Sequence, residues 1–213
     1  PLEPIRMKSK IFELPSEDQG ALPRFVSHLQ LGGQRGRVFA GCLGWIVADL
    51  SVLFGYEILG ANFEGAVMTN VIFSASILTE TRFFGAELKG SEFIDTILQD
   101  ADFIDANASN AIFENSNCKN AILSYGTFLK TNFDGAELWG LRAANAQFDG
   151  ASFRNADLSE AFFDHADLRD ARFQGANLDF ADFTGARIDG ATFEGAKTDK
   201  AKNLPISAKG STT

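Results

Sequence analysis

A five-residue period governs most of the chain and limits its possible folds more than any other feature. From Ala61 to Lys200 the sequence divides into 28 consecutive five-residue units without an insertion or deletion. The first residue of a unit is almost always small, and the third is Phe, Leu, Ile or Met except at Ala108, Cys118, Ala143 and Thr198. A period of five matches neither an α-helix nor a β-strand. We therefore expect a chain that turns a corner every five residues, with the third residue in the centre and the fifth in the turn.

A longer period of 20 residues is superimposed on this pattern and predicts four units per coil, hence seven coils. Two columns of third residues show it. The first is uninterrupted Phe: Phe73, Phe93, Phe113, Phe133, Phe153, Phe173 and Phe193. The second is aliphatic apart from one cysteine: Leu78, Leu98, Cys118, Leu138, Leu158 and Leu178. Each such side chain stabilises the fold by about 1.5–3 kcal/mol when fully buried, so we expect both columns to lie in the core.

The unit resembles that of the pentapeptide repeat family, which has a small residue, Asp or Asn, Leu or Phe, and two mostly polar residues. The resemblance covers residues 61–200. It implies a right-handed quadrilateral β-helix. The predicted fold class is therefore an all-β solenoid of about seven coils with an N-terminal, partly helical extension.

The charge and the scarcity of reactive residues argue against nucleic-acid binding and against catalysis. The net charge is −9 and the isoelectric point is near 4.7, whereas a nucleic-acid-binding surface needs clustered Lys and Arg. Cys42 and Cys118 make neither a metal-ligand spacing nor a disulfide framework. His165 is a fifth residue and should point outward, and the second-position carboxylates are expected to cap corners: Asp102, Asp157, Asp167 and Asp182. We predict no catalytic residue, no cofactor and no metal site.

The segments outside the repeats are less regular. Residues 1–37 are predicted to be an irregular extension with a short helix near Leu22–Leu31, and residues 201–213 a disordered tail. Residues 38–60 form an apolar segment, and three interpretations of its part Val38–Tyr56 stay open. It could cap the β-helix, span a membrane, or dock to a partner protein. Arg35 and Arg37 precede it as a membrane span would require, but Asp49 would be costly within a membrane.

Apolar residues at outward-facing positions of the unit are the candidate partner-binding residues. They concentrate in the first four coils, and positions from Ala144 onward are mainly polar, with Phe162 as the main exception. An exposed apolar patch usually marks an interface. The candidates are Ile72, Ile77, Phe84, Ile94, Ile97, Ile104, Ile112, Ile122, Leu129 and Trp139, together with Trp45 from the apolar segment 38–60.

Two functions follow from these features as hypotheses. The first is a non-catalytic scaffold that docks to a protein complex through the N-terminal segment and the first coils. The resemblance suggests a photosynthetic membrane complex and a thylakoid location, in the lumen or at the membrane, with the cytoplasm as the alternative. The second, which the resemblance also implies because some family members are acidic rods of this kind, is a mimic of DNA that modulates a type II topoisomerase. The 22 Asp and Glu against 11 Lys and Arg in residues 61–200 are consistent with it.

Overall fold

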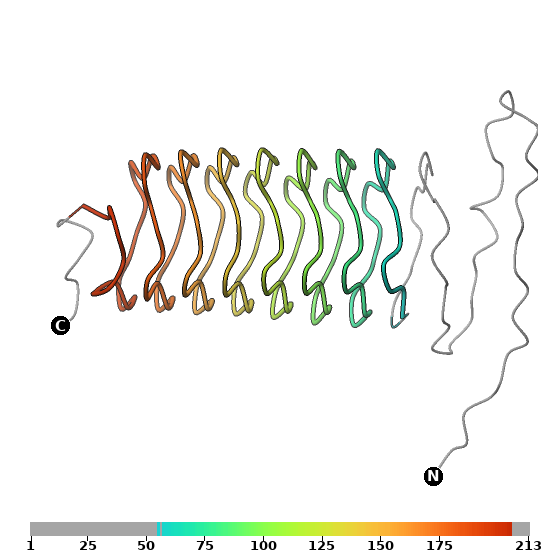
Figure 1. The fold of residues 1–213 in the computed structure, drawn as a ribbon, viewed down its shortest axis with the longest axis horizontal. Coiled ribbons are helices and arrows are strands. Elements are labelled where there is room, and N and C mark those ends of the chain that lie inside the picture. Colours follow the sequence, from blue (N-terminus) through green and yellow to red (C-terminus); the bar gives the residue numbers. More distant parts are fainter. Residues whose placement is uncertain (1–54, 56, 206–213) are drawn as a thin grey trace, which may run out of the picture.

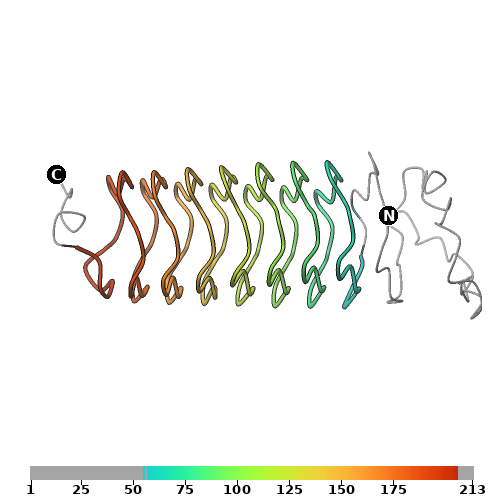
Figure 2. The same cartoon turned by 90° about the horizontal axis from the view of Figure 1, so that it is seen from above.

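The computed structural model describes Gly55 and residues 57–205, and the structural statements below refer to these residues. They form a rod of stacked coils, which Figures 1 and 2 show from two perpendicular directions. The predicted extension 1–37, Trp45 and most of the apolar segment 38–60 lie outside the described residues, as does most of the predicted tail 201–213.

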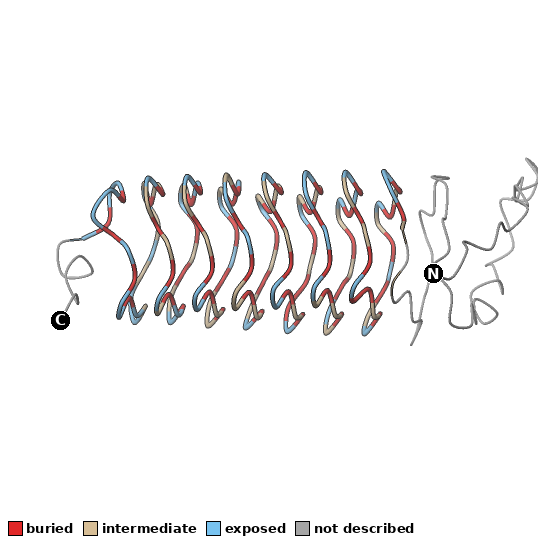
Figure 3. Cartoon of the chain, turned by 90° about the horizontal axis from the view of Figure 1, so that it is seen from below, coloured by how far each residue is buried: buried red, intermediate tan, exposed pale blue. Residues whose placement is uncertain are grey.

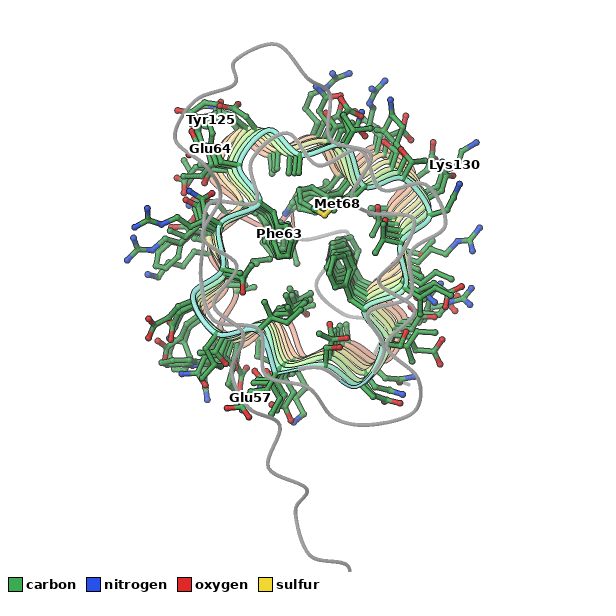
Figure 4. The ribbon with its side chains drawn as sticks, turned by 90° about the vertical axis from the view of Figure 1, so that its right-hand side faces the viewer. Glu57, Phe63, Glu64, Met68, Tyr125 and Lys130 are labelled. Atoms are coloured by element: carbon green, nitrogen blue, oxygen red, sulfur yellow. The ribbon has the colours of Figure 1, made fainter. Side chains whose placement is uncertain are left out.

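The coils are held together by parallel β-bridges between second residues that lie 20 positions apart. The bridges run without a break from Glu57, which pairs with Ile77, to Lys202, which pairs with Asp182. The described chain has no helix and no extended strand, because each side of a coil offers only one bridging residue between two turns. Figure 4 views the rod from its N-terminal end, and the chain passes clockwise from Glu57 through Phe63 to Met68 as it recedes. The coil is therefore a right-handed, four-sided β-helix, as predicted.

The four sides are numbered in chain order. Side 1 holds the units that begin at residues 61, 81, 101, 121, 141, 161 and 181, and sides 2, 3 and 4 hold the units that begin five, ten and fifteen residues later. The first and third residues of a unit point inward and are buried almost throughout, whereas the second faces outward. Figure 3 shows this alternation of buried and exposed positions along every coil.

The fourth and fifth residues form the corners. Every fifth residue from Gly55 to Gly195 has a positive φ, between +53° and +74°. The N–H of the first residue of the next unit donates a hydrogen bond to the carbonyl of the third residue and closes the turn, as from Ala66 N to Phe63 O at 3.0 Å. A positive φ in the third position of such a turn is typical of type II, which explains the frequent Gly, Asn and Asp at this position.

Hydrogen bonds between adjacent coils pair the backbone N–H and C=O groups of each side. The N–H of Phe63 donates to the carbonyl of Arg82 at 2.7 Å, and the N–H of Arg82 donates to the carbonyl of Ala61 at 2.9 Å. The corner N–H of Gly65 donates to the carbonyl of Phe84 at 2.8 Å. Because this pattern repeats from coil to coil, the middle of each side offers few free backbone groups to a partner.

The core contains the predicted Phe column on side 3, with ring centroids of adjacent coils 4.6–5.1 Å apart from Phe73 to Phe193. The predicted aliphatic column, which includes Cys118, lies on the inner face of side 4, opposite side 2. It is fully buried from Leu78 to Leu178. Both predicted columns are thus confirmed as core.

A second stack of Phe rings, which the periodicity did not reveal, packs edge-on against the first and changes sides twice. It follows side 1 through Phe63, Phe83 and Phe103, side 2 through Phe128 and Phe148, and side 1 again through Phe163 and Phe183. At the two crossings the ring centroids are 6.5 Å apart (Phe103 and Phe128) and 6.1 Å apart (Phe148 and Phe163).

The crossings explain two of the four exceptions in the repeat. Ala108 precedes Phe128 on side 2 by one coil, and Ala143 precedes Phe163 on side 1 by one coil. Both alanines are fully buried. A larger side chain at either position would compete with a ring for one core volume, so a small residue marks each crossing.

Candidate interaction surface

The described part of the rod contains no site with the features of an active centre. No group of three or more His, Cys, Asp or Glu residues within it is arranged to hold a metal ion. A shallow hollow of about 460 Å³ lies over side 3 and its two corners, and its charged lining is Lys130, Asp134, Arg154, Asp170 and Arg172. It is open to solvent. In it the hydroxyl of Ser152 donates a hydrogen bond to Asp134 Oδ1 at 2.5 Å, and the same oxygen accepts a hydrogen bond from the backbone N–H of Arg154 at 3.0 Å, so this carboxylate is engaged in local structure.

Cys118 is a core residue, as predicted. Its thiol is fully buried and lies 3.2 Å from the hydroxyl of Ser116. Burial raises the pKa of the Cys118 thiol to about 12, because the thiolate would lose its hydration. A thiol that stays protonated is neither a nucleophile nor a metal ligand at neutral pH.

The four second-position carboxylates are engaged in local structure. In each unit one carboxylate oxygen accepts a hydrogen bond from the N–H two residues later: those of Ile104, Ser159, Arg169 and Thr184. These side chains therefore cap corners, as the sequence predicted.

Two of these carboxyl groups have lowered pKa values. For Asp167 the main cause is the guanidinium of Arg169, whose Nε and Nη2 donate at 2.8 and 2.7 Å. For Asp182 the main causes are hydrogen bonds from the Thr184 hydroxyl and the Asn203 amide. Both groups are held in the ionised form, which leaves no general acid here.

The surface is distinguished by large apolar side chains that project into solvent. Eight are exposed: Leu59, Val67, Phe84, Ile97, Tyr125, Trp139, Phe162 and Phe180. Six of the eight lie on side 1 or on one of its two corners. Phe162 is on the side itself, Phe84 and Tyr125 are on the corner toward side 2, and the other three are on the corner toward side 4. We name side 1 with its two corners the side-1 surface; it is on the left in Figure 4, where Glu64 and Tyr125 mark its upper corner.

The candidates chosen from the sequence are spread around the whole rod. Ile77 and Ile97 are on side 4, Ile72 and Ile112 on side 3, and Ile122 on side 1. The other five are on the corners: Phe84, Ile94, Ile104, Leu129 and Trp139. Only Phe84, Ile97 and Trp139 are exposed, and the other described candidates are half-buried.

Sequence reasoning missed four of the exposed apolar residues and gave Phe162 only as an exception. Leu59 precedes the residues taken as repeats, Val67 was passed over among second residues, and Tyr125 and Phe180 occupy the fifth position. If every outward residue is assigned to one of the four sides by the 20-residue period, six of the eight exposed apolar residues fall on the side-1 surface. The exposed apolar surface is therefore not confined to the first four coils.

The side-1 surface is acidic around its apolar residues. It holds ten carboxylates and five basic side chains, the fifth being Lys202, whose β-bridge to Asp182 continues side 1. Two of the five pair with acidic groups, Lys119 with Glu137 at 2.6 Å and Lys200 with Asp179 at 3.5 Å. Lys200 also lies 5.0 Å from the ring centroid of Phe180. Within the described residues, Arg82 and Arg142 form no ion pair.

The structure does not test whether Val38–Tyr56 spans a membrane, because all of this segment except Gly55 lies outside the described residues. Along the part of the chain that the structure describes, no helix is long and apolar enough to cross a membrane.

Comparison with known proteins identifies the repeat. The family model "Pentapeptide repeats" matches in eight copies, over residues 76–115, 101–140, 131–175, 146–185 and 163–197. Among curated proteins no sequence matches the chain.

Several solved structures are similar in fold. A trypsin-treated variant of QnrB1, a plasmid-mediated fluoroquinolone resistance protein, is 22% identical over 75% of this chain and 92% of its own, with a TM-score of 0.50. HetL, a pentapeptide repeat protein of the cyanobacterium Nostoc sp. strain PCC 7120 involved in heterocyst differentiation regulation, is 23% identical over 78% of this chain and 86% of its own, with a TM-score of 0.31. A pentapeptide repeat protein from the Arabidopsis thaliana thylakoid lumen is 29% identical over 45% of this chain and 67% of its own, with a TM-score of 0.29. At these values the likeness to QnrB1 concerns the fold alone, and the other two carry no argument about function.

Proposed function

Since this chain belongs to the pentapeptide repeat family, whose members are generally non-catalytic binding or structural proteins, we propose that it is a protein-binding scaffold. It docks to a larger assembly through the apolar residues of its surface. The partner is a protein, because an acidic rod repels nucleic acid.

The observation that carries this proposal is the concentration of six of the eight exposed large apolar side chains on one side of the rod and its two corners. The core does not need them, since inward-pointing residues already fill it. Exposing such side chains to water is unfavourable unless a partner covers them.

The docking region includes the first coils of the side-1 surface, where Leu59 and Phe84 are exposed. The apolar segment 38–56, with Trp45, is part of the same proposal, although all of it except Gly55 lies outside the described residues. A membrane or photosynthetic complex as the partner rests on the family resemblance and stays a prediction.

The experiment is a comparison of native sizes. The protein is extracted under mild conditions from its own cells, and its mass on a native gel is compared with that of the purified recombinant chain. We expect the native protein to migrate well above 23.1 kDa, together with a partner that dissociates in detergent or urea. Migration of both samples as the same free monomer would contradict the scaffold proposal.

A second candidate function is mimicry of DNA toward a type II topoisomerase. It is supported by side 4 and the corner that follows it, which hold eight carboxylates and three lysines between Glu57 and Lys200. Lys119 and Lys200 are moreover paired with Glu137 and Asp179. A gyrase supercoiling assay with and without a fluoroquinolone tests this candidate, and it fails if micromolar protein leaves both reactions unchanged.

A further inference from the structure

Six apolar residues of the side-1 surface form a stripe that crosses the surface diagonally, and two further exposed ones, Leu59 and Tyr125, lie off it. It starts on the corner toward side 2, passes over the side, and ends on the corner toward side 4. Its members, in order along the rod, are Phe84, Ile104, Ile122, Trp139, Phe162 and Phe180. Four of the six are exposed, by 39–51%. From Phe84 to Phe180 the stripe spans nearly five coils, which is about 23 Å at a strand spacing of about 4.8 Å.

The backbone of side 1 restricts how a partner can bind. The N–H and C=O of Phe162 both bond to the coil before, in the bonds from Phe162 N to Leu141 O and from Ala143 N to Phe162 O, both 2.8 Å. The backbone groups of Arg142 are paired with the coil before it in the same way. A partner strand would therefore find no row of free N–H and C=O groups here. An α-helix satisfies its own backbone and can bind through side chains alone.

The length of the stripe also suits a helix. About 15 residues of α-helix, at about 1.5 Å per residue, would cover about 23 Å. Such a helix presents a continuous apolar face when its apolar residues recur every three or four positions.

The charge of the surroundings sets the composition of that helix. The stripe lies between carboxylates on both corners, among them Glu80, Asp100 and Glu160 on one and Asp105 and Asp164 on the other. The excess of ten carboxylates over five basic groups favours Lys and Arg beside the apolar face. The same excess disfavours an anionic membrane surface as the occupant.

We propose that the side-1 surface binds a basic amphipathic helix of a partner protein, with the apolar face of the helix on the Phe84–Phe180 stripe. This inference rests on the proposed scaffold function and specifies its partner. Phe84 and Phe162 are two anchors of this contact, since both are aromatic, exposed by 40% and 47%, and separated by nearly four coils, so that they hold distant parts of the helix.

The test uses a fluorescently labelled 18-residue peptide of Leu and Lys, with Leu on one helical face, and a peptide of the same composition in scrambled order. Fluorescence anisotropy with the full chain measures both affinities at physiological salt. We expect the amphipathic peptide to bind at least tenfold more tightly than the scrambled one. Equal affinities would overturn the proposal, since charge alone would then explain binding.

Matched variants locate the site. The double variant Phe84→Ser/Phe162→Ser should lower the affinity for the amphipathic peptide at least tenfold. The control Val67→Ser/Ile97→Ser removes two apolar residues of similar exposure on sides 2 and 4 and should change it less than twofold. Equal losses in both double variants would overturn the assignment to side 1. Thermal unfolding of each variant checks that the coil is intact. We expect no large loss of stability, because all four side chains point outward.

The outcome for the helix can be separated from that for the scaffold. If the peptide does not bind but the native assembly still depends on Phe84 and Phe162, the partner is not a basic helix and the scaffold function stands. If no native assembly exists, the scaffold function fails whatever the peptide does.

Discussion

The ring of Phe128 occupies the space beside Gly126 in which any larger residue would place its side chain. A Cβ on Gly126 would come within 2.5 Å of Phe128 Cε2 and within 3.1 Å of the carbonyl oxygen of Leu123. Gly126 has no positive φ, so it is not required by a turn. It is the one Gly among the first residues of the 28 units, and it lies where the second Phe stack first reaches side 2.

We therefore predict that Gly126→Ala lowers the free energy of unfolding by about 1–3 kcal/mol, because the ring must leave its preferred position. The measurement is urea denaturation. In a Phe128→Leu background the same substitution should cost clearly less. If the penalty is the same in both backgrounds, the contact with Phe128 is not its cause.

Corner glycines should differ in how well they tolerate alanine. A Cβ on Gly135 would meet Asn115 Oδ1 at 2.5 Å, whereas a Cβ on Gly85 would meet nothing within 4 Å. Both have positive φ, +70° and +62°, so both substitutions carry a conformational cost of about 1–2 kcal/mol. We predict that Gly135→Ala destabilises more than Gly85→Ala in thermal unfolding.

The contribution of Asn115 is tested by a second substitution. Asn115→Gly removes the side chain that leans over Gly135, so Gly135→Ala in that background should approach the cost of Gly85→Ala. An unchanged difference would show that the two corners differ for another reason.

The free energy of unfolding of the rod should fall in acid, because Asp167 and Asp182 have lowered pKa values in the folded state and lose their charge at low pH. A carboxyl group whose pKa is lower in the folded state stabilises the fold above its unfolded pKa, and this contribution is lost as pH falls through the folded pKa. We predict that the urea midpoint falls as pH is lowered from about 5 to about 3. Arg169→Gln removes the main cause of the lowered pKa of Asp167 and should reduce this dependence.

Arg154→Gln is the matched control, since Arg154 forms no ion pair within the described residues. It should leave the acid dependence as in the unsubstituted chain. An equal effect of both substitutions would point to overall charge and not to the Asp167–Arg169 pair.

Cys118 should be unreactive while the protein is folded. Its raised pKa and complete burial keep the thiol protonated and out of reach at pH 8. In a Cys42→Ser variant we predict no alkylation by iodoacetamide in buffer and complete alkylation in urea, read by mass spectrometry. Alkylation of the folded protein at the rate of a free cysteine would contradict the buried position.

The fold could be predicted from the sequence because its rules are local and repeated. The residue types at the third position determine the core and those at the fifth position the corners. The 20-residue recurrence from Phe73 to Phe193 determines the length of one coil. The second Phe stack could not be predicted in this way. Its crossing from Phe103 to Phe128 depends on how rings on two different sides share one core volume, and the sequence shows only a small residue at Ala108.

The candidate surface was harder to derive than the core. Outward isoleucines such as Ile72 and Ile112 are half-buried because side chains of adjacent coils lie about 4.8 Å away and cover part of them. Tyr125 and Phe180, at corners where Gly and Asn are usual, are more than half exposed, by 60% and 51%. Exposure therefore depends on the side and the corner as well as on residue type, and the role of the sequence-derived candidates stays a prediction.

The most direct test of the account is the dependence of the native assembly on the side-1 surface. Tagged full-length chain, Phe84→Ser/Phe162→Ser and Val67→Ser/Ile97→Ser are each expressed in the cells of origin, and the partner retained per molecule of tagged protein is quantified by mass spectrometry. We predict that Phe84→Ser/Phe162→Ser loses at least nine-tenths of the retained partner, a tenfold loss that corresponds to about 1.4 kcal/mol of binding free energy. The control Val67→Ser/Ile97→Ser should retain the partner. Full retention by the side-1 variant would contradict the account.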